Sequence, residues 1–179
     1  LLARAIAVAA ASSAAAGWAQ KTELLVYTAL ETDQLKAYGE SFNKANPNIE
    51  LKYVRDSTGV ITARILAEKA NPQADFILGV SASSMEIFKA EGMLAPYSPV
   101  GFGELTPTFS DAARPPAWVG QDVYAAVVCY NTVEGKKKGI PKPESWADLA
   151  KPVYKGQVTM PNPASSGTGY LSVSGWLQI

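Results

Sequence analysis

Short runs of β-branched and aromatic residues alternate along the first half of the chain with longer segments whose apolar residues recur every three or four positions. The short runs have the pattern of strands, and the longer segments have the period of helices that bury one face. The strands and helices expected in this half cover residues 24–27, 33–45, 49–53, 58–70, 74–80 and 83–90. Because strands alternate with helices, we expect an α/β fold with a mostly parallel sheet. The run at 74–80 is apolar enough to be covered on both faces.

The second half of the chain has a less regular pattern. Residues 96–116 are rich in proline and glycine and predict a loop. After this loop we expect strands at 124–131 and 157–160, a capped helical turn at 145–149 and a helix at 168–179. Because the chain stops inside the last predicted helix, we expect it to be the truncated N-terminal portion of a longer protein.

Residues 1–19 have the composition of an export signal. Arg4 is followed by a nearly unbroken run of Ala, Ile, Val and Leu, which is too short to span a bilayer of ~30 Å. The run ends in Gly17, Trp18 and Ala19, a pattern that suits cleavage near Ala19. We therefore expect a periplasmic protein whose mature chain begins near Gln20.

The charge balance and the missing residue types exclude several classes of function. Sixteen basic residues offset sixteen acidic ones, so the chain has no net field to hold a nucleic acid, and we expect no nucleic-acid partner. The chain contains no histidine, the usual general base of hydrolases and the commonest transition-metal ligand. We expect no catalytic residues, no metal site and no cofactor. Cys129, the single cysteine, lies in an apolar run and is expected to be buried.

Serine and threonine gather at three places where a predicted strand runs into a helix. The hydroxyl residues concerned are Ser57, Thr58, Ser83, Ser165, Ser166 and Thr168. In an open parallel sheet the carboxyl ends of the strands line one crevice, so these helix N-termini should converge there. Free backbone N–H groups, helix dipoles and hydroxyl donors together favour a bound phosphate, phosphonate or sulfate group. Each segment taken alone is better explained by ordinary helix capping, whereas three such segments in succession favour ligand binding.

Acidic and aromatic side chains are expected around the same crevice. Glu31 follows the first strand, where it either receives a ligand ammonium group or caps the next helix; for Asp33 we expect the capping role. Trp118, Tyr130 and Tyr170 are candidates to wall the crevice, although aromatic residues in such positions often serve packing alone.

Four segments resemble one known family. They read VYTALE at 26–31, RDSTGV at 55–60, KPVYKG at 151–156 and MPNPASSGTGY at 160–170. In these segments the chain is similar to periplasmic solute-binding proteins of ABC importers, in the branch that holds ferric-ion, phosphosugar and phosphonate binders. The match is closest to 2-aminoethylphosphonate-binding proteins.

This resemblance implies a two-lobed periplasmic binding protein fold (type II) with a hinge, and a monomer that delivers its ligand to an ABC permease in the inner membrane. The first lobe would cover 20–125, the hinge crossover strand 126–132, and the beginning of the second lobe 133–179. The resemblance assigns the ligand oxyanion to the hydroxyls of Ser57, Thr58, Ser165, Ser166 and Thr168, with Ser83 as a weaker candidate. It assigns the ligand amine to Glu31. Tyr170 belongs to the same expected ligand-binding set.

Other functions stay open on the sequence alone. Within the family, the alternatives to a phosphonate ligand are a ferric ion, a phosphosugar and a sulfate. An exported enzyme with a nucleophile at Ser165 or Ser166 is a remote alternative, since no Gly-x-Ser-x-Gly or Ser-x-x-Lys motif supports it. A sensor that binds the same solute without transport differs only in its partner.

Overall fold

A computed structural model of the chain describes residues 21–178. The expected export signal at 1–19 lies outside the described residues. Three strands form one parallel sheet: β1 (Thr22–Thr28), β2 (Ile49–Arg55) and β3 (Phe76–Leu78). The sheet order is β2-β1-β3, and β1 pairs along its whole length with β2. This α/β architecture with a parallel sheet confirms the predicted fold class.

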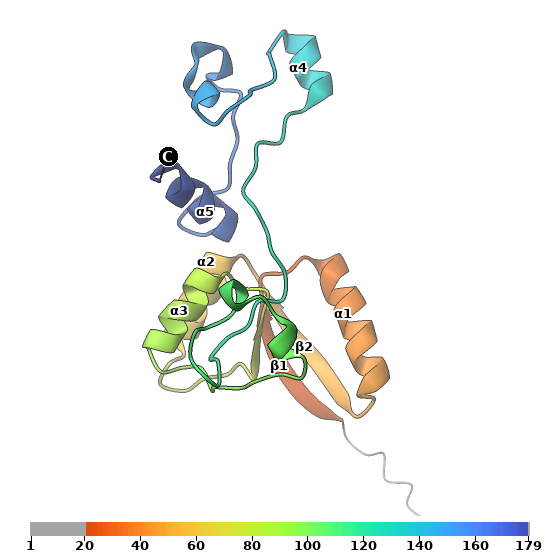
Figure 1. Ribbon diagram of the computed structural model, residues 1–179. Coiled ribbons are helices and arrows are strands. Elements are labelled where there is room, and N and C mark those ends of the chain that lie inside the picture. The colour runs from red at the N-terminus through yellow and green to blue at the C-terminus, as the bar shows by residue number, and fades with distance from the viewer. Residues whose placement is uncertain (1–20, 179) are drawn as a thin grey trace, which may run out of the picture.

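Helices cover both faces of the sheet. They are α1 (Thr32–Ala45), α2 (Thr58–Ala67) and α3 (Ala82–Ala90). The chain steps from β1 to β2 in one direction and then back past β1 to β3, so right-handed crossovers place α1 and α2 on opposite faces. Figure 1 shows α1 on one side of the strands and the pair α2 and α3 on the other. The central strand β1 is consequently the most deeply covered.

The apolar core lies between β1, α2 and α3. Its buried members are Tyr27, Ile61, Ile65 and Phe88, of which Tyr27 and Phe88 are fully inaccessible to solvent. The Tyr27 hydroxyl donates to the Glu68 carboxylate at 2.9 Å, so the polar end of this buried ring is satisfied. Both isoleucines are spaced four residues apart on one face of α2, in agreement with the helical period predicted for 58–70.

Two details of this half differ from the sequence prediction. Strand β3 has three residues, and the side chain of Phe76 is 55% exposed, so the strand is not covered on both faces. It lies at an edge of the described sheet, where one side has no neighbouring strand. The N-cap of α1 is Glu31 rather than Asp33, which lies in the first helical turn.

A long loop follows α3 and is held against it by a buried carboxylate. It contains two short 3-10 helices, η1 (Phe102–Glu104) and η2 (Pro107–Phe109). Asp111 is 1% exposed and accepts from Lys89 Nζ at 2.5 Å, from Ala117 N at 2.9 Å and from Ala113 N at 3.1 Å. The ion pair with Lys89 and the two backbone donors lower the pKa of Asp111 to about 2.

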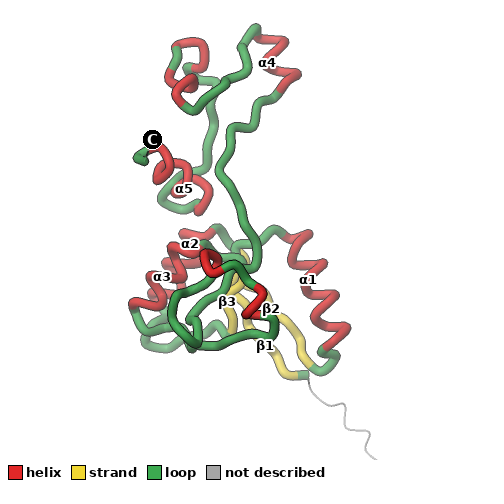
Figure 2. The backbone as a smooth tube through the Cα atoms, viewed as in Figure 1, coloured by secondary structure: helices red, strands yellow, loops and turns green. Residues whose placement is uncertain are grey.

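The second half of the chain contains short helices joined by extended segments. They are α4 (Thr132–Lys138), η3 (Ala147–Ala150), η4 (Pro152–Tyr154) and α5 (Gly167–Trp176). The connections to and from this part are loops (Figure 2). No helix within 21–178 is long and apolar enough to cross a membrane.

The strands predicted at 124–131 and 157–160 are wrong as secondary structure, while the role of 126–132 as the crossover between two lobes stays a prediction. Both segments lack strand hydrogen bonding because no described strand lies beside either of them. Cys129 is exposed rather than buried for the same reason. Its neighbour Val127 is 68% exposed, so the apolar run is only partly covered among residues 21–178.

The buried ring of Phe88 provides a direct test of the core. We expect Phe88→Ala to lower the free energy of unfolding by ~3–5 kcal/mol, because it removes a large buried side chain and leaves a cavity. The matched control is Ile87→Ala in the same helix, where the side chain is 45% exposed and the loss should be ~1 kcal/mol or less. Urea unfolding of the purified proteins measures both, and equal losses would contradict this core.

Asp111 should make the free energy of unfolding depend on pH in the acidic range. Its pKa is lower in the folded protein than in the unfolded chain, so its stabilising contribution is present above about pH 4 and is lost as the pH falls toward 2. We expect Asp111→Asn to flatten the dependence of the free energy of unfolding on pH across this window. Glu104→Gln, which alters an exposed carboxylate of the same loop, is the control. An unchanged slope in Asp111→Asn would contradict the buried ion pair.

Candidate ligand-binding cleft

The sheet order creates a crevice at the carboxyl ends of the strands. The chain leaves β1 toward α1 on one face and leaves β3 toward α3 on the other, so the two connections diverge between these strands. Ligands of open α/β sheets bind at such a switch point. A cavity of about 1200 Å³ lies there, and the segments after all three strands line it. We call this cavity the cleft.

The N-terminus of α2 presents hydroxyl groups to the cleft. Ser57 is the N-cap residue, but its side chain makes no capping hydrogen bond. The N–H of Ser57 instead donates to Asp56 Oδ1 at 2.7 Å. Thr58 is the first helical residue, and both Ser57 and Thr58 are half-buried and line the cleft. Their hydroxyls are therefore available to a ligand.

The N-terminus of α5 meets that of α2 across the cleft. Gly59 N donates to Ser165 O at 3.0 Å. A Cβ added at Gly59 would lie 2.8 Å from Ser165 O, and one added at Gly167 would lie 2.8 Å from Thr58 Oγ1. Side chains at these two positions would push the helix ends apart, so glycine permits the close approach. Segments more than 100 residues apart in the chain thus form one site.

The α5 segment contributes a cap and a free hydroxyl. Ser166 Oγ accepts from Gly169 N at 3.3 Å and caps the helix, while Thr168 is exposed and lines the cleft. The doubled serine is therefore divided in role. The carbonyl oxygen of Ser165 accepts a hydrogen bond from Gly59 N, and Ser165 does not line the cleft.

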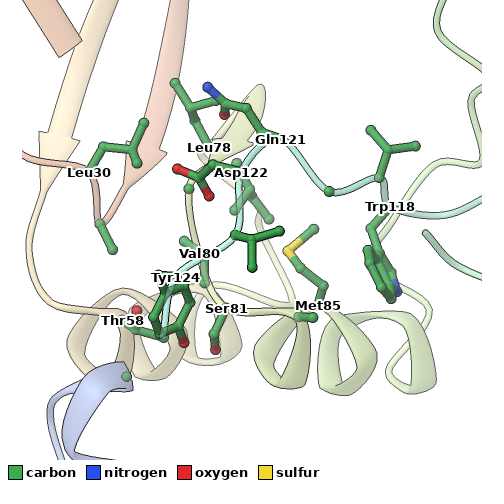
Figure 3. Close-up of a pocket in the computed structure, with 18 of the residues that line it drawn as sticks. Leu30, Thr58, Leu78, Val80, Ser81, Met85, Trp118, Gln121, Asp122 and Tyr124 are labelled. Atoms are coloured by element: carbon green, nitrogen blue, oxygen red, sulfur yellow. The ribbon is translucent and has the colours of Figure 1, made fainter. Parts of the chain in front are cut away.

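At the N-terminus of α3, Ser81 rather than Ser83 faces the cleft. Ser81 is the N-cap residue and lines the cavity, whereas Ser83 is exposed outside it. Their hydroxyl oxygens are 2.9 Å apart, so Ser83 contacts the site only through Ser81. Figure 3 shows Thr58, Ser81 and Tyr124 close to one another at one end of the cleft.

Five of the eight predicted ligand-binding residues line the cleft, and three do not. Those in the cleft are Glu31, Ser57, Thr58, Ser166 and Thr168. Those outside it are Ser83, Ser165 and Tyr170. The Tyr170 side chain is 56% exposed. The three predicted Ser/Thr segments do converge, although a different serine represents the second of them.

The charged residues of the cleft consist of one cation and three carboxylates. Arg55, the last residue of β2, donates from Nε to Leu30 O at 2.7 Å and from Nη2 to Glu31 Oε2. Asp56 accepts from the Ser57 backbone, and Asp122 has no ion-pair or hydrogen-bond partner among the described side chains. The cleft therefore holds an acidic side chain, Asp122, that is open to a ligand donor.

The far wall of the cleft comes from the segment that follows the long loop. Gln121, Asp122 and Tyr124 line it, together with Trp118, whose indole N–H donates to Glu86 Oε1 at 2.7 Å. Desolvation raises the pKa of the Tyr124 phenol, so this group remains a neutral donor at neutral pH. Trp118 was expected from the sequence to wall the crevice, whereas the neighbouring polar residues Gln121, Asp122 and Tyr124 were not. The signal available was their position immediately before the predicted crossover.

Tyr130 belongs to a different cavity. Its hydroxyl donates to Ile140 O at 2.6 Å, and it lines a hollow of about 320 Å³ with Trp146 and Trp176. The two indole rings pack edge to face at 5.7 Å. Tyr130 therefore packs the second half of the chain instead of walling the cleft.

Metal ligands do not cluster in the part of the chain that the structure describes. No group of three or more His, Cys, Asp or Glu side chains there is arranged to hold a metal ion. The donors that converge on the cleft are neutral hydroxyls and backbone N–H groups, with one guanidinium nearby. Such a donor set suits an oxyanion better than a cation.

Two curated relatives are similar to this chain over nearly all of its length. An uncharacterized protein of Haemophilus influenzae is 28% identical over 186 residues, which cover 100% of this chain and 51% of the relative. A probable ABC transporter periplasmic-binding protein of Sinorhizobium fredii, y4fP, is 30% identical over 174 residues, which cover 93% of this chain and 45% of the relative. The chain spans about half the length of the curated relatives that it matches.

Two solved structures share the fold. The periplasmic binding protein AfuA from Actinobacillus pleuropneumoniae, solved with fructose-6-phosphate bound, matches with a TM-score of 0.70 and 29% identity over 83% of this chain and 47% of AfuA. The periplasmic binding protein P5PA matches with a TM-score of 0.70 and 24% identity over 88% of this chain and 51% of P5PA. The described residues therefore have the fold of periplasmic binding proteins.

The sequence profile of one family matches residues 71–178, more than half of the chain. That stretch includes the N-termini of α3 and α5 and the far wall of the cleft. This chain belongs to the bacterial extracellular solute-binding protein family.

Proposed function

We propose that this chain is the extracytoplasmic solute-binding component of an ABC importer and that its cleft binds a small organic phosphonate or phosphate ester. Its role is binding and delivery rather than catalysis. The family match and the similarity to a probable ABC transporter periplasmic-binding protein support this role. The partner would be a permease in the inner membrane, and the site of action the periplasm.

The observation that carries the proposal is the meeting of the α2 and α5 N-termini at the cleft. Both helix ends direct N–H groups and the positive ends of their dipoles to one place. Ser57, Thr58 and Thr168 add hydroxyls that take no part in capping. Several neutral donors around one point can bind several oxygens of a tetrahedral anion at once, which is the requirement of a phosphonate or phosphate group.

Within this class we propose 2-aminoethylphosphonate as the ligand. Its phosphonate would lie at the two helix ends, and its ammonium group would face the carboxylates of the cleft. Two carboxylates that line the cavity are candidates for this role, Glu31 at the rim and Asp122 on the far wall. The hydroxyl of Tyr124 supplies a further neutral donor near Ser81.

A phosphosugar is the second candidate, and the similarity to AfuA favours it. AfuA was solved with fructose-6-phosphate bound and is 29% identical to this chain. The same helix ends would hold the phosphate of such a ligand. Asp122 would then accept hydrogen bonds from sugar hydroxyls instead of from an ammonium group, and the Gln121 amide could donate to or accept from such hydroxyls.

Calorimetric titration separates these ligands. The experiment uses the longest form of the protein that the gene encodes, with 2-aminoethylphosphonate, inorganic phosphate, sulfate, a hexose phosphate and ferric citrate as probes. We expect heat of binding from 2-aminoethylphosphonate and none from ferric citrate. Binding of the hexose phosphate alone would keep the oxyanion site and change the ligand. Binding of ferric citrate alone would contradict the proposed site.

One hydroxyl of the site offers a matched pair of variants. Thr58→Val keeps the shape of the side chain but removes its donor, so a ligand oxygen would lose a hydrogen bond worth ~1–3 kcal/mol, or roughly 5- to 150-fold in affinity. The control is Ser83→Ala, which removes a hydroxyl that lies just outside the cleft and should leave affinity unchanged. Equal effects of the two variants would contradict the assigned position of the oxyanion.

A further inference from the structure

The cleft that we propose for an anion is lined by more negative than positive charge. Arg55 is the single Lys or Arg among its lining residues, which also include the carboxylates of Glu31, Asp56 and Asp122. Carboxylates close to a phosphonate raise its free energy by repulsion, while a cation lowers it. The position and partners of Arg55 therefore strongly affect how favourably the cleft binds a negatively charged ligand.

Arg55 is held at the edge of the cleft by two acceptors. It ends β2 and pairs in register with Thr28, the last residue of β1, so its backbone lies at the carboxyl edge of the sheet. Its side chain lies on the same face of β2 as Tyr53, toward α1. There Nε donates to Leu30 O at 2.7 Å and Nη2 to Glu31 Oε2, and the guanidinium retains further N–H donors.

Glu31 already has partners within the protein. It is the N-cap residue of α1, so its carboxylate lies at the positive end of that helix. Its backbone N–H donates to Gln34 Oε1 at 3.1 Å, which fixes the first turn. With Arg55 on the other side, this carboxylate already has a counter-charge and gains less from a ligand ammonium group than an unpaired carboxylate would.

We infer that Arg55 is a specificity-determining residue that supplies the positive charge for the ligand oxyanion, and that Glu31 is its positioning counter-ion rather than the receptor of the ligand amine. This inference rests on the proposed function. Glu31 aims the guanidinium and at the same time reduces the charge that the anion meets. Asp122, which has no described partner, is then the carboxylate that receives an ammonium group.

The test compares 2-aminoethylphosphonate with ethylphosphonate, which lacks the amine. Calorimetry on the longest form of the protein measures both ligands against the wild type, Arg55→Gln, Arg55→Lys and Glu31→Gln. We expect Arg55→Gln to weaken both ligands by roughly 10- to 150-fold, because a charge-assisted hydrogen bond is lost. It should also reduce the salt dependence of affinity, which a purely structural effect would not change. Arg55→Lys keeps the charge but not the planar guanidinium group, so its affinity for both ligands should lie between those of the wild type and Arg55→Gln.

Glu31→Gln is the decisive variant because the two roles of Glu31 predict opposite results. Glutamine keeps an oxygen for Arg55 but removes the negative charge, so we expect both phosphonates to bind about two- to tenfold more tightly. If Glu31 received the amine, Glu31→Gln would lower the affinity for 2-aminoethylphosphonate but not for ethylphosphonate, and that result would overturn the inference.

The outcomes separate this inference from the proposed function. Unchanged affinity for both ligands in Arg55→Gln, with a wild type that binds them, would overturn the role of Arg55 and leave the oxyanion site intact. A wild type that binds neither phosphonate nor the hexose phosphate would overturn the proposed function, and this inference with it. Thermal melting of each variant checks that the fold is retained, and Glu31→Gln provides an independent test should Arg55→Gln not fold.

Discussion

The parallel pairing of β1 with β2 on one side and β3 on the other is the constraint on which the rest of the structure depends. Because β1 is central, the two crossovers run in opposite directions and their helices cover opposite faces. A crevice must then open where the chain leaves β1 and β3 on different sides. The buried contacts of Tyr27 with α2 and α3 stabilise this arrangement, so the core and the position of the cleft have one cause.

The chemistry of the cleft follows from the same geometry. Each strand ends at the same edge of the sheet, so each following helix begins there and brings uncompensated N–H groups. Serine and threonine at these helix starts are commonly read as caps. In this protein Ser166 is a cap, whereas Ser57 makes no capping bond and Thr168 is exposed to the cleft. Glycine at 59 and 167 lets the two helix ends approach, which gathers donors from distant parts of the chain around one point.

Much of the first half could be predicted from the sequence because its pattern and its burial agree. The isoleucines of α2 and the aromatic residue of α3 fall on the helical faces that pack on β1. Predictions failed where tertiary context decides the outcome. The apolar run around Cys129 has the pattern of a buried strand, but no described strand pairs with it. Ser81 was missed in favour of Ser83 because a difference of two residues in a helix start cannot be resolved by composition. The counter-ion role of Glu31 depends on the approach of Arg55 from another strand, which only the fold reveals.

The central claim is that an oxyanion binds where the N-termini of α2 and α5 meet. A crystal structure of the longest form of the protein with 2-aminoethylphosphonate bound tests it most directly. We expect the phosphonate oxygens to lie within hydrogen-bond distance of the hydroxyls of Ser57, Thr58 and Thr168. A phosphonate bound elsewhere, with these hydroxyls facing only solvent, would contradict the account.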